Sequence, residues 1–346
     1  MVFDVSGEPV HTRCLAVALT QGEGDSVEFR ADILDLRKAG LMGLGGRIAT
    51  AGIIHKMEFL GSFAVETGII ERIEWNQSHV MHEANRATKG ECCRDPVDRL
   101  TALVGTPLGA GFASSLKQCF GGPLGCTHVN TLFQELSAFV SRFQFMRDEN
   151  PAYREERKVG DRLAKRSLCF DAFFPSEGDA TSNLSVRLAD VFYAPNHENG
   201  SEVLFRYEEV GVLAEVDLKG WQIGNVRARE RSRSGPACED SPWTIRSDEL
   251  GDFEGRSLGG GMARFCLERF GTRRVDACLL SALLCLAPGM TQVGVAVSNS
   301  LIPSSSARPP NSRLSGPGPC YMLRADGPLI ETIFAGGRLR SEPEPD

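Results

Sequence analysis

The sequence predicts an α+β fold made of two diverged tandem copies, each an antiparallel sheet with helices packed on one face, related by a pseudo-twofold axis. Three observations lead to this fold class. Short runs rich in β-forming residues precede helical patterns instead of alternating with them. Glycine-rich turns separate these runs. The same order of segments occurs twice along the chain. Strands followed by helices favour α+β over a parallel sheet of βαβ units.

Composition limits the classes of function. The chain has 346 residues, of which 42% are hydrophobic and 24% charged, as in globular proteins with a core. Its net charge of −7 and its pI near 5.5 give no global support for nucleic-acid binding. We expect no membrane partner, because no uninterrupted apolar run approaches the length of a spanning helix.

The cysteines and the first residues predict a compartment. The opening "MVFDVSGEPVHTR" has no basic region followed by an apolar stretch, so it does not resemble a signal peptide. Eleven cysteines at irregular spacing, an odd number, indicate reduced thiols rather than a disulfide framework. We therefore expect a cytoplasmic protein.

Three pairs of segments recur at nearly constant offsets. Residues 55–75 align with 208–228, and the strand at 11–19 aligns with 164–173. An offset of 150 residues relates the glycine-rich stretches, with Gly105, Leu108, Gly109, Gly111, Phe120 and Gly121 matching Gly255, Leu258, Gly259, Gly261, Phe270 and Gly271. The predicted units are a first copy at 8–148, a second copy at 160–297, and a connector with a C-terminal hairpin at 298–346.

Each copy ends in a predicted helix. In the first copy an apolar stripe recurs at steps of three and four residues, and it comprises Val129, Leu132, Phe133, Leu136, Phe139, Val140 and Phe143. Thr127 is the expected N-cap, after a turn at 121–125. In the second copy "DACLLSALLCLA" is apolar almost all round, which predicts a more deeply buried helix.

The chain end differs in composition from both copies. Residues 298–319 are rich in Ser, Pro and Gly, which predicts a loose connector. "CYMLRADGPLIETIF" (320–334) predicts a strand, a turn at 326–328 and a second strand.

Five motifs occur together in the order of a known bacterial family. They are "HTR" (11–13), "IHKMEF" (54–59), "LVGTPLGAGF" (103–112), "GGPLGCTHVNTL" (121–132) and, in the tail, "CYMLRADGPLI" (320–330). In this the chain resembles the domain-of-unknown-function family 2889, over residues 11–146 and the tail, with the middle resembling it only as a degraded second copy. The resemblance implies a setting rather than a mechanism, because genes of this family often lie beside genes for degrading aromatic compounds and acyl-CoA thioesters.

The two copies differ at their ionisable positions. The second copy has Asp276 and Cys278 where the first has Cys126 and His128, and it has Glu208 in place of His55. Ala164 or Lys165 lies near the position of His11. A site built from His11, Arg13, His55, Cys126 and His128 would therefore exist only in the first copy.

Several interpretations of Cys126 and His128 are open. A thiol at a helix N-terminus has a lowered pKa, and with a histidine base nearby it could act as a nucleophile. Cys126, His128 and either His55 or His11 could instead ligate a catalytic zinc ion, although CxH is not a recognised zinc spacing. In the plainest interpretation Cys126 fills space in the core and His128 is solvated.

The interpretation that we adopt is acid–base chemistry without a cofactor or metal. His55, His128 and His11 would move protons. The substrate-binding residues would be Arg13, Arg324, Tyr321 and Cys126, with the arginines holding a carboxylate. The predicted function is a cofactor-independent lyase of the decarboxylase type, acting on a lignin-derived aromatic carboxylic acid in bacterial aromatic catabolism. The alternatives are a non-catalytic protein that binds an aromatic or acyl ligand and a metal-dependent hydrolase. A homodimer is left open.

Overall fold

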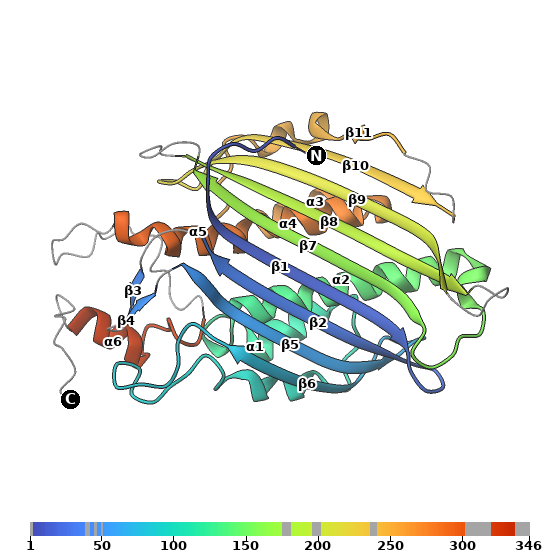
Figure 1. The fold of residues 1–346 in the computed structure, drawn as a ribbon, viewed down its shortest axis with the longest axis horizontal. Helices are drawn as coiled ribbons and strands as arrows, with labels where there is room; N and C mark the ends of the chain where they lie inside the picture. Colours follow the sequence, from blue (N-terminus) through green and yellow to red (C-terminus); the bar gives the residue numbers. More distant parts are fainter. Residues whose placement is uncertain are drawn as a thin grey trace.

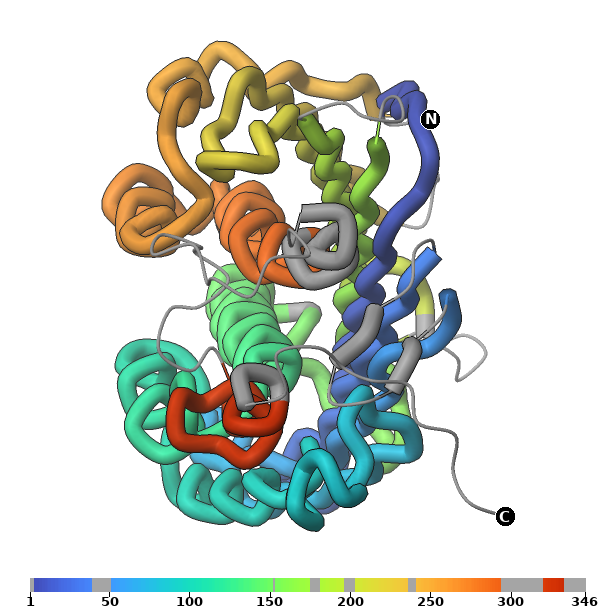
Figure 2. Tube along the Cα trace, turned by 90° about the vertical axis from the view of Figure 1, so that its left-hand side faces the viewer, coloured from blue at the N-terminus to red at the C-terminus, as the bar shows by residue number. Residues whose placement is uncertain are grey.

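The computed structural model contains one nine-stranded antiparallel sheet with helices on one of its faces (Figures 1 and 2). It describes residues 3–38, 42–44, 47–49, 51–174, 181–195, 202–235, 241–301 and 320–335. The α+β class predicted from the sequence is confirmed.

The strands form a sheet in the order β11-β10-β9-β8-β7-β1-β2-β5-β6, with a separate ribbon of β3 and β4. The first half of the chain contributes β1 (Glu8–Gln21), β2 (Ser26–Arg37), β3 (Met42–Leu44), β4 (Arg47–Ala49), β5 (Gly52–Ala64) and β6 (Ile70–His79). The second half contributes β7 (Arg162–Phe174), β8 (Thr181–Pro195), β9 (Glu202–Asp217), β10 (Ile223–Ser234) and β11 (Thr244–Ile245).

The α-helices follow the strands within each half. They are α1 (Phe112–Phe120), α2 (Thr127–Glu149), α3 (Met262–Phe270), α4 (Ala277–Leu284), α5 (Leu286–Leu301) and α6 (Pro328–Ala335). Short 3₁₀ helices span Val97–Leu103, Gly122–Leu124, Pro151–Arg154, Ser247–Phe253 and Arg274–Asp276.

The two halves share one sheet, whereas the sequence suggested a separate sheet for each. β1 and β7 pair in antiparallel fashion from Glu8–Phe174 to Thr20–Arg162. Without this pairing both would be edge strands with a row of unsatisfied backbone groups, and pairing satisfies those groups. β1 is therefore a central strand.

The alternation of side chains along β1 separates two environments. Arg13, Leu15 and Val17 are buried and face the helices, whereas Cys14 and Ala16 are half-buried on the opposite face. This follows from the two-residue period of a strand.

The helices cover the buried face as their sequences predict. The stripe residues of α2 are buried, and Leu132, Leu136 and Phe139 have no exposed surface. In α4, Leu279 and Leu283 are also fully buried, as expected for an almost uniformly apolar helix. The stretch Arg274–Val293 is long and apolar enough, by length and composition alone, to cross a membrane, but 56% of its apolar 18-residue window is buried inside the protein. That burial is sufficient reason for its apolar composition.

The C-terminal hairpin predicted at 320–334 is wrong. Turns occupy 320–327, and α6 begins at Pro328. Proline lacks the N–H that a strand ladder needs and fits the first position of a helix, which is where Pro328 stands. α5 also continues to Leu301, past the predicted start of the connector at 298. Residues 302–319 and 336–346 lie outside the described residues.

The tail packs against the first half of the chain. The Tyr321 backbone N–H donates to the Gly125 carbonyl over 2.7 Å. The Thr332 hydroxyl donates to the Ala87 carbonyl over 2.8 Å, and Lys89 pairs with Glu331 over 2.6 Å. Segments far apart in the sequence therefore meet beside the start of α2 (Figure 2).

A substitution at Gly61 in β5 tests how tightly the first half is packed. A Cβ at this position would lie 2.1 Å from the Arg72 carbonyl oxygen and 2.5 Å from the Phe29 ring. We expect Gly61→Ala to lower the free energy of unfolding by about 1–3 kcal/mol, because neither neighbour can move without disturbing the sheet. Gly224→Ala in β10 is the control, since its nearest neighbour atom would lie 3.9 Å away. Urea unfolding of both variants measures the difference, and equal losses would contradict the packing described.

Candidate functional site

A row of buried polar side chains crosses the first half of the sheet. Arg13 on β1 lies directly opposite Asp35 on β2, and Asp35 lies directly opposite His55 on β5. All three side chains face the helices, and none is more than 3% exposed. His11, two residues before Arg13, is on the same face and fully buried. We name this group, together with Cys126 and His128, the Asp35 cluster.

Asp35 is the centre of the cluster. Arg13 holds it in a bidentate ion pair, with Nε–Oδ1 and Nη2–Oδ2 distances of 2.8 Å. His128 Nε2 lies 2.6 Å from Asp35 Oδ2, within the distance of an ion pair. Burial alone would raise the pKa of Asp35, but Arg13 and His128 outweigh it and hold that pKa well below its usual value.

Cys126 and His128 stand at the start of α2. The helix begins at Thr127, and Cys126 is its N-cap, so the prediction of Thr127 as N-cap is wrong by one residue. Cys126 Sγ lies 3.4 Å from His128 Nδ1. The thiol is therefore placed beside both an imidazole and the positive end of the helix dipole.

The Cys126–His128 pair favours separated charges. Burial opposes the charged forms of both groups. Asp35 and Cys126 nevertheless raise the pKa of His128 to about 9. His128 and the backbone N–H groups of His128 and Val129 lower the pKa of the Cys126 thiol. Both shifts act in the direction of a thiolate–imidazolium pair beside the Asp35 carboxylate.

The other two histidines of the cluster are neutral at pH 7. Burial, followed by the charge of His128, holds the pKa of His55 well below its usual value. Burial also lowers the pKa of His11 to about 4, against the attraction of Asp35, whose Oδ2 is 3.8 Å from His11 Nε2. The His55 and His128 rings lie 4.1 Å apart between centroids. Neutral imidazoles in this position can accept protons.

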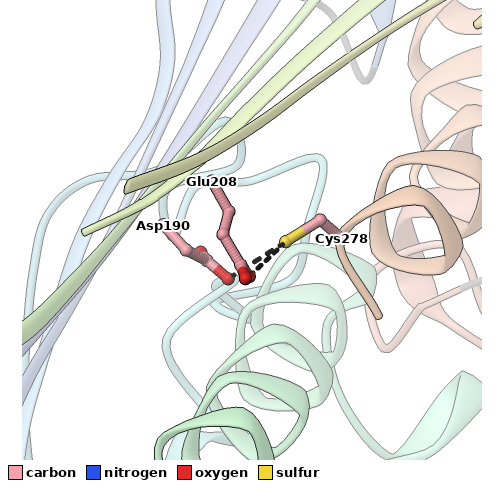
Figure 3. A group of neighbouring side chains, drawn as sticks. All are labelled: Asp190, Glu208 and Cys278. Atoms are coloured by element: carbon pink, nitrogen blue, oxygen red, sulfur yellow. Dashed lines mark hydrogen bonds between the residues drawn. The ribbon is translucent and has the colours of Figure 1, made fainter. Parts of the chain in front are cut away.

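A second cluster occupies the matching place in the second half. Arg166 on β7, Asp190 on β8 and Glu208 on β9 lie directly opposite one another in register. Arg166 pairs bidentately with Asp190, over 2.8 Å and 2.7 Å. Cys278, the second residue of α4, lies 3.4 Å from Asp190 and 3.6 Å from Glu208 through its sulfur (Figure 3). This cluster holds no imidazole.

Asp190, Glu208 and Cys278 are the one group of three or more His, Cys, Asp or Glu side chains in the described ranges whose potential ligand atoms all lie within 4.8 Å of one another. Their charges do not suit a cation. Arg166 and Arg142 already occupy the two carboxylates. Burial, Asp190 and Glu208 raise the pKa of the Cys278 thiol well above its usual value, so it stays protonated and donates to the carboxylates. The group is a charge-balanced polar core.

The predicted site residues fall into two sets. The structure brings His11, Arg13, His55, Cys126 and His128 together, as the sequence suggested. Arg324 instead pairs with Glu91 through both terminal nitrogens, one of them at 2.8 Å, and its guanidinium lies 4.2 Å from the centre of the Tyr321 ring. The contacts of these two side chains are thus with the tail and its neighbours rather than with the Asp35 cluster.

The role predicted for Arg13 needs correction. Two of its three nitrogens bind Asp35, and Nη1 alone is buried with no hydrogen-bond partner. A substrate carboxylate could therefore bind one nitrogen of Arg13, but it could not form a bidentate pair with the guanidinium. Asp35 occupies the other two nitrogens, and the sequence analysis did not include Asp35 among the site residues.

A signal for Asp35 was present in the sequence. Phe29, Ala31 and Ile33 mark the apolar face of β2 at a period of two, and Asp35 continues that face. A carboxylate on the buried face of a strand requires a cation nearby. Arg13 is that cation, but only the pairing of β1 with β2 shows it.

The comparisons with known proteins find a family similarity in the first half of the chain only. Residues 11–141 match the family described as "Protein of unknown function (DUF2889)", which confirms the resemblance inferred from the motifs. The match does not extend to the second half. Neither the curated proteins nor the solved structures include a significant match to the chain.

Removing the charge of Asp35 tests the cluster's contribution to stability. We expect Asp35→Asn to lower the free energy of unfolding by about 3–5 kcal/mol, because Arg13 and His128 are then left buried without their counter-ion. Asp32→Asn is the matched control on the same strand, since its pair with Arg30 is exposed and should contribute at most about 1 kcal/mol. Chemical unfolding measures both variants, and similar losses would refute a central role for Asp35.

The protonation of His128 gives a second test. Its pKa in the folded protein is about 9, above the ordinary 6.5, so protonated His128 stabilises the fold fully below pH 6.5. That contribution is lost as the pH rises through 9. We expect an NMR titration of labelled histidine to show one imidazole with a pKa near 9, absent in His128→Gln. In Cys126→Ser, which removes the coupled thiol, stability should still fall across this range. A His128 resonance that titrates near 6.5 would contradict the ion pairs described.

Proposed function

Residues 11–141 carry the domain of family 2889, and we propose that this domain is an enzyme in which Cys126 acts as a nucleophile and His128 as its acid and base. One observation carries the proposal. Sulfur, imidazole and carboxylate form a chain, with 3.4 Å between Cys126 Sγ and His128 Nδ1 and 2.6 Å between His128 Nε2 and Asp35 Oδ2. A nucleophile, a base and a group that orients the base are the parts that covalent acyl transfer needs.

The residues support the following sequence of steps. The Cys126 thiolate attacks the carbonyl carbon of an ester or thioester, and the carbonyl electrons move to oxygen. As the tetrahedral intermediate collapses, His128 gives its proton to the leaving oxygen or sulfur. Neutral His128 then takes a proton from water, which attacks the acyl group on Cys126 and releases a carboxylic acid. Arg13 keeps Asp35 ionised, so the imidazolium regenerates after each turnover.

The surroundings favour a small acyl group. Cys126 is 8% exposed and His128 5% exposed, so little water reaches the reacting atoms. The Tyr321 backbone N–H donates to the carbonyl of Gly125, the residue before Cys126. The tail therefore also shields this region from water. Aryl esters and acyl thioesters are the substrate classes that match thiolate chemistry in a dry site.

The lyase predicted from the sequence is the second candidate. Two observations favour it: Arg13 Nη1 is buried and unpartnered, and His55 is a neutral imidazole in the same cluster. The donor could bind one oxygen of an aromatic carboxylate, and His55 could exchange a proton with the carbon skeleton. The aromatic carboxylate substrate, the aromatic catabolic role, the cytoplasmic location and the homodimer stay predictions, as do the ligand-binding protein and the metal-dependent hydrolase.

We propose further that the two halves arose by tandem duplication. Each half runs through four long strands, a 3₁₀ helix, a nine-residue helix and a further helix. In each half an arginine, an aspartate and a third polar residue stand in register across neighbouring strands. The third residue is His55 in one half and Glu208 in the other, and the helix residue is His128 or Cys278. The cluster of the first half would then be catalytic, and the cluster of the second half would be a structural set of paired charges.

Covalent trapping tests the nucleophile without knowledge of the substrate. We expect an activated aryl ester to acylate Cys126, and iodoacetamide to block this reaction, because the surroundings lower the pKa of the Cys126 thiol. Cys126→Ser and His128→Gln should each lower the acylation rate by roughly 10³-fold or more. Peptide mass spectrometry locates the modification. Cys119→Ser, a half-buried cysteine on α1, is the control and should react as the wild type does.

The same preparation separates the candidates. A panel of aryl esters, acyl thioesters and aromatic carboxylates is incubated with each variant. Carboxylate turnover that survives Cys126→Ser but not His55→Ala would favour the lyase. A rise in unfolding temperature with one of these compounds, without formation of any product, would favour the non-catalytic ligand-binding protein. Acylation of Cys126→Ser at the wild-type rate would refute the nucleophile.

A further inference from the structure

Two cysteines meet on the face of the sheet opposite the helices. Cys14 on β1 and Cys169 on β7 are directly opposite each other in the register, and their sulfur atoms lie 3.6 Å apart. They are separated by 155 residues in the sequence, so only the junction of the two halves brings them together. Among the cysteines of the described ranges, this is the pair for which a sulfur–sulfur contact is found.

The pair is accessible. Both side chains are half-buried, and both line a cavity of about 740 Å³ on this face. Charged side chains from neighbouring strands, among them Arg30, Lys56 and Arg187, line the same cavity. Small polar reagents can therefore reach the sulfurs.

The surroundings make the two sulfurs unequal. Cys169 Sγ lies 3.5 Å from Asp171 Oδ2, and Thr12 holds that carboxylate through a hydrogen bond of 2.5 Å. The hydrogen bond to Cys14, burial and the charge of Asp171 raise the pKa of Cys169. The hydrogen bond from Cys169 lowers the pKa of Cys14 in spite of burial. Cys14 is therefore the better nucleophile, and Cys169 keeps a proton.

We propose that Cys14 and Cys169 form a redox-active dithiol that a peroxide converts reversibly into a cross-strand disulfide between the two halves of the sheet. The sulfurs need to approach from 3.6 Å to about 2.0 Å, within the reach of side-chain rotation for directly paired strands. The site is distinct from the Asp35 cluster, because alternate residues of β1 point to opposite faces.

The chemistry balances with a peroxide as oxidant. The Cys14 thiolate attacks one oxygen of hydrogen peroxide, the O–O bond breaks, and hydroxide leaves while Cys14 becomes a sulfenic acid. The Cys169 sulfur then attacks the Cys14 sulfur, the S–O bond breaks, and the leaving hydroxide takes the Cys169 proton, which Asp171 can relay. Two thiols lose two electrons in total, and the peroxide is reduced to two waters. A dithiol reductant reverses the step.

Peptide mapping of the full chain tests the proposal. Wild-type protein is treated with dilute hydrogen peroxide, alkylated and digested with trypsin. We expect the peptides 14–30 and 167–187 to appear as one linked species that loses two hydrogens, with two fewer alkylated thiols, and dithiothreitol to restore both. Because the linkage closes a long loop, the oxidised protein should also unfold at a higher temperature.

Two variants complete the experiment. Cys169→Ser should leave Cys14 as a sulfenic acid that a dimedone probe captures, whereas Cys14→Ser should give neither the linked species nor the adduct at Cys169. Cys119→Ser is the control and should form the linkage as the wild type does. Alkylation of both Cys14 and Cys169 after peroxide, or oxidation of Cys14 to a sulfinic acid without any linked peptide, would overturn the proposal.

Discussion

The buried ion pair between Arg13 and Asp35 is the interaction on which the first half of the molecule depends. An unpaired charge buried in the protein loses more hydration free energy than its packing contacts contribute, so neither residue could be buried here as a charged group without the other. Joined by two hydrogen bonds of 2.8 Å, they become one polar unit in the sheet. Asp35 Oδ2, which Arg13 Nη2 binds, also lies 2.6 Å from His128 Nε2, and the carboxylate favours the charged form of that imidazole. The chemistry of Cys126 is thus set, through His128, by a carboxylate on another strand.

Charge balance links the two halves. In the second half Arg166 pairs with Asp190, as Arg13 does with Asp35, but it also reaches Glu135 on α2 over 2.9 Å. Glu135 belongs to the first half, so this guanidinium connects the helix of one half to the sheet of the other. Arg142, also on α2, pairs with Glu208 of the second half. α2 therefore completes both clusters, one through its first turn and the other through its middle.

The two faces of β1 serve different purposes because neighbouring residues point in opposite directions. Arg13 belongs to the buried Asp35 cluster, and Cys14 belongs to the cavity on the other face. The pairing of β1 with β2 creates the first site, and its pairing with β7 creates the second. A single strand in the middle of the sheet thus holds two separate sets of reactive groups without direct contact between them.

By itself the sequence determined that strands precede helices in each half, the buried stripe of α2 and the resemblance of residues 11–141 to a family, because these depend on local periodicity and on contiguous motifs. It also predicted that His11, Arg13, His55, Cys126 and His128 belong together. Only the tertiary structure decided that one sheet contains both halves, that Asp35 neutralises Arg13 and that residues after Pro328 form a helix against the first half. The physical reason is that register between distant strands selects the partners of buried charges, and no local pattern encodes that register.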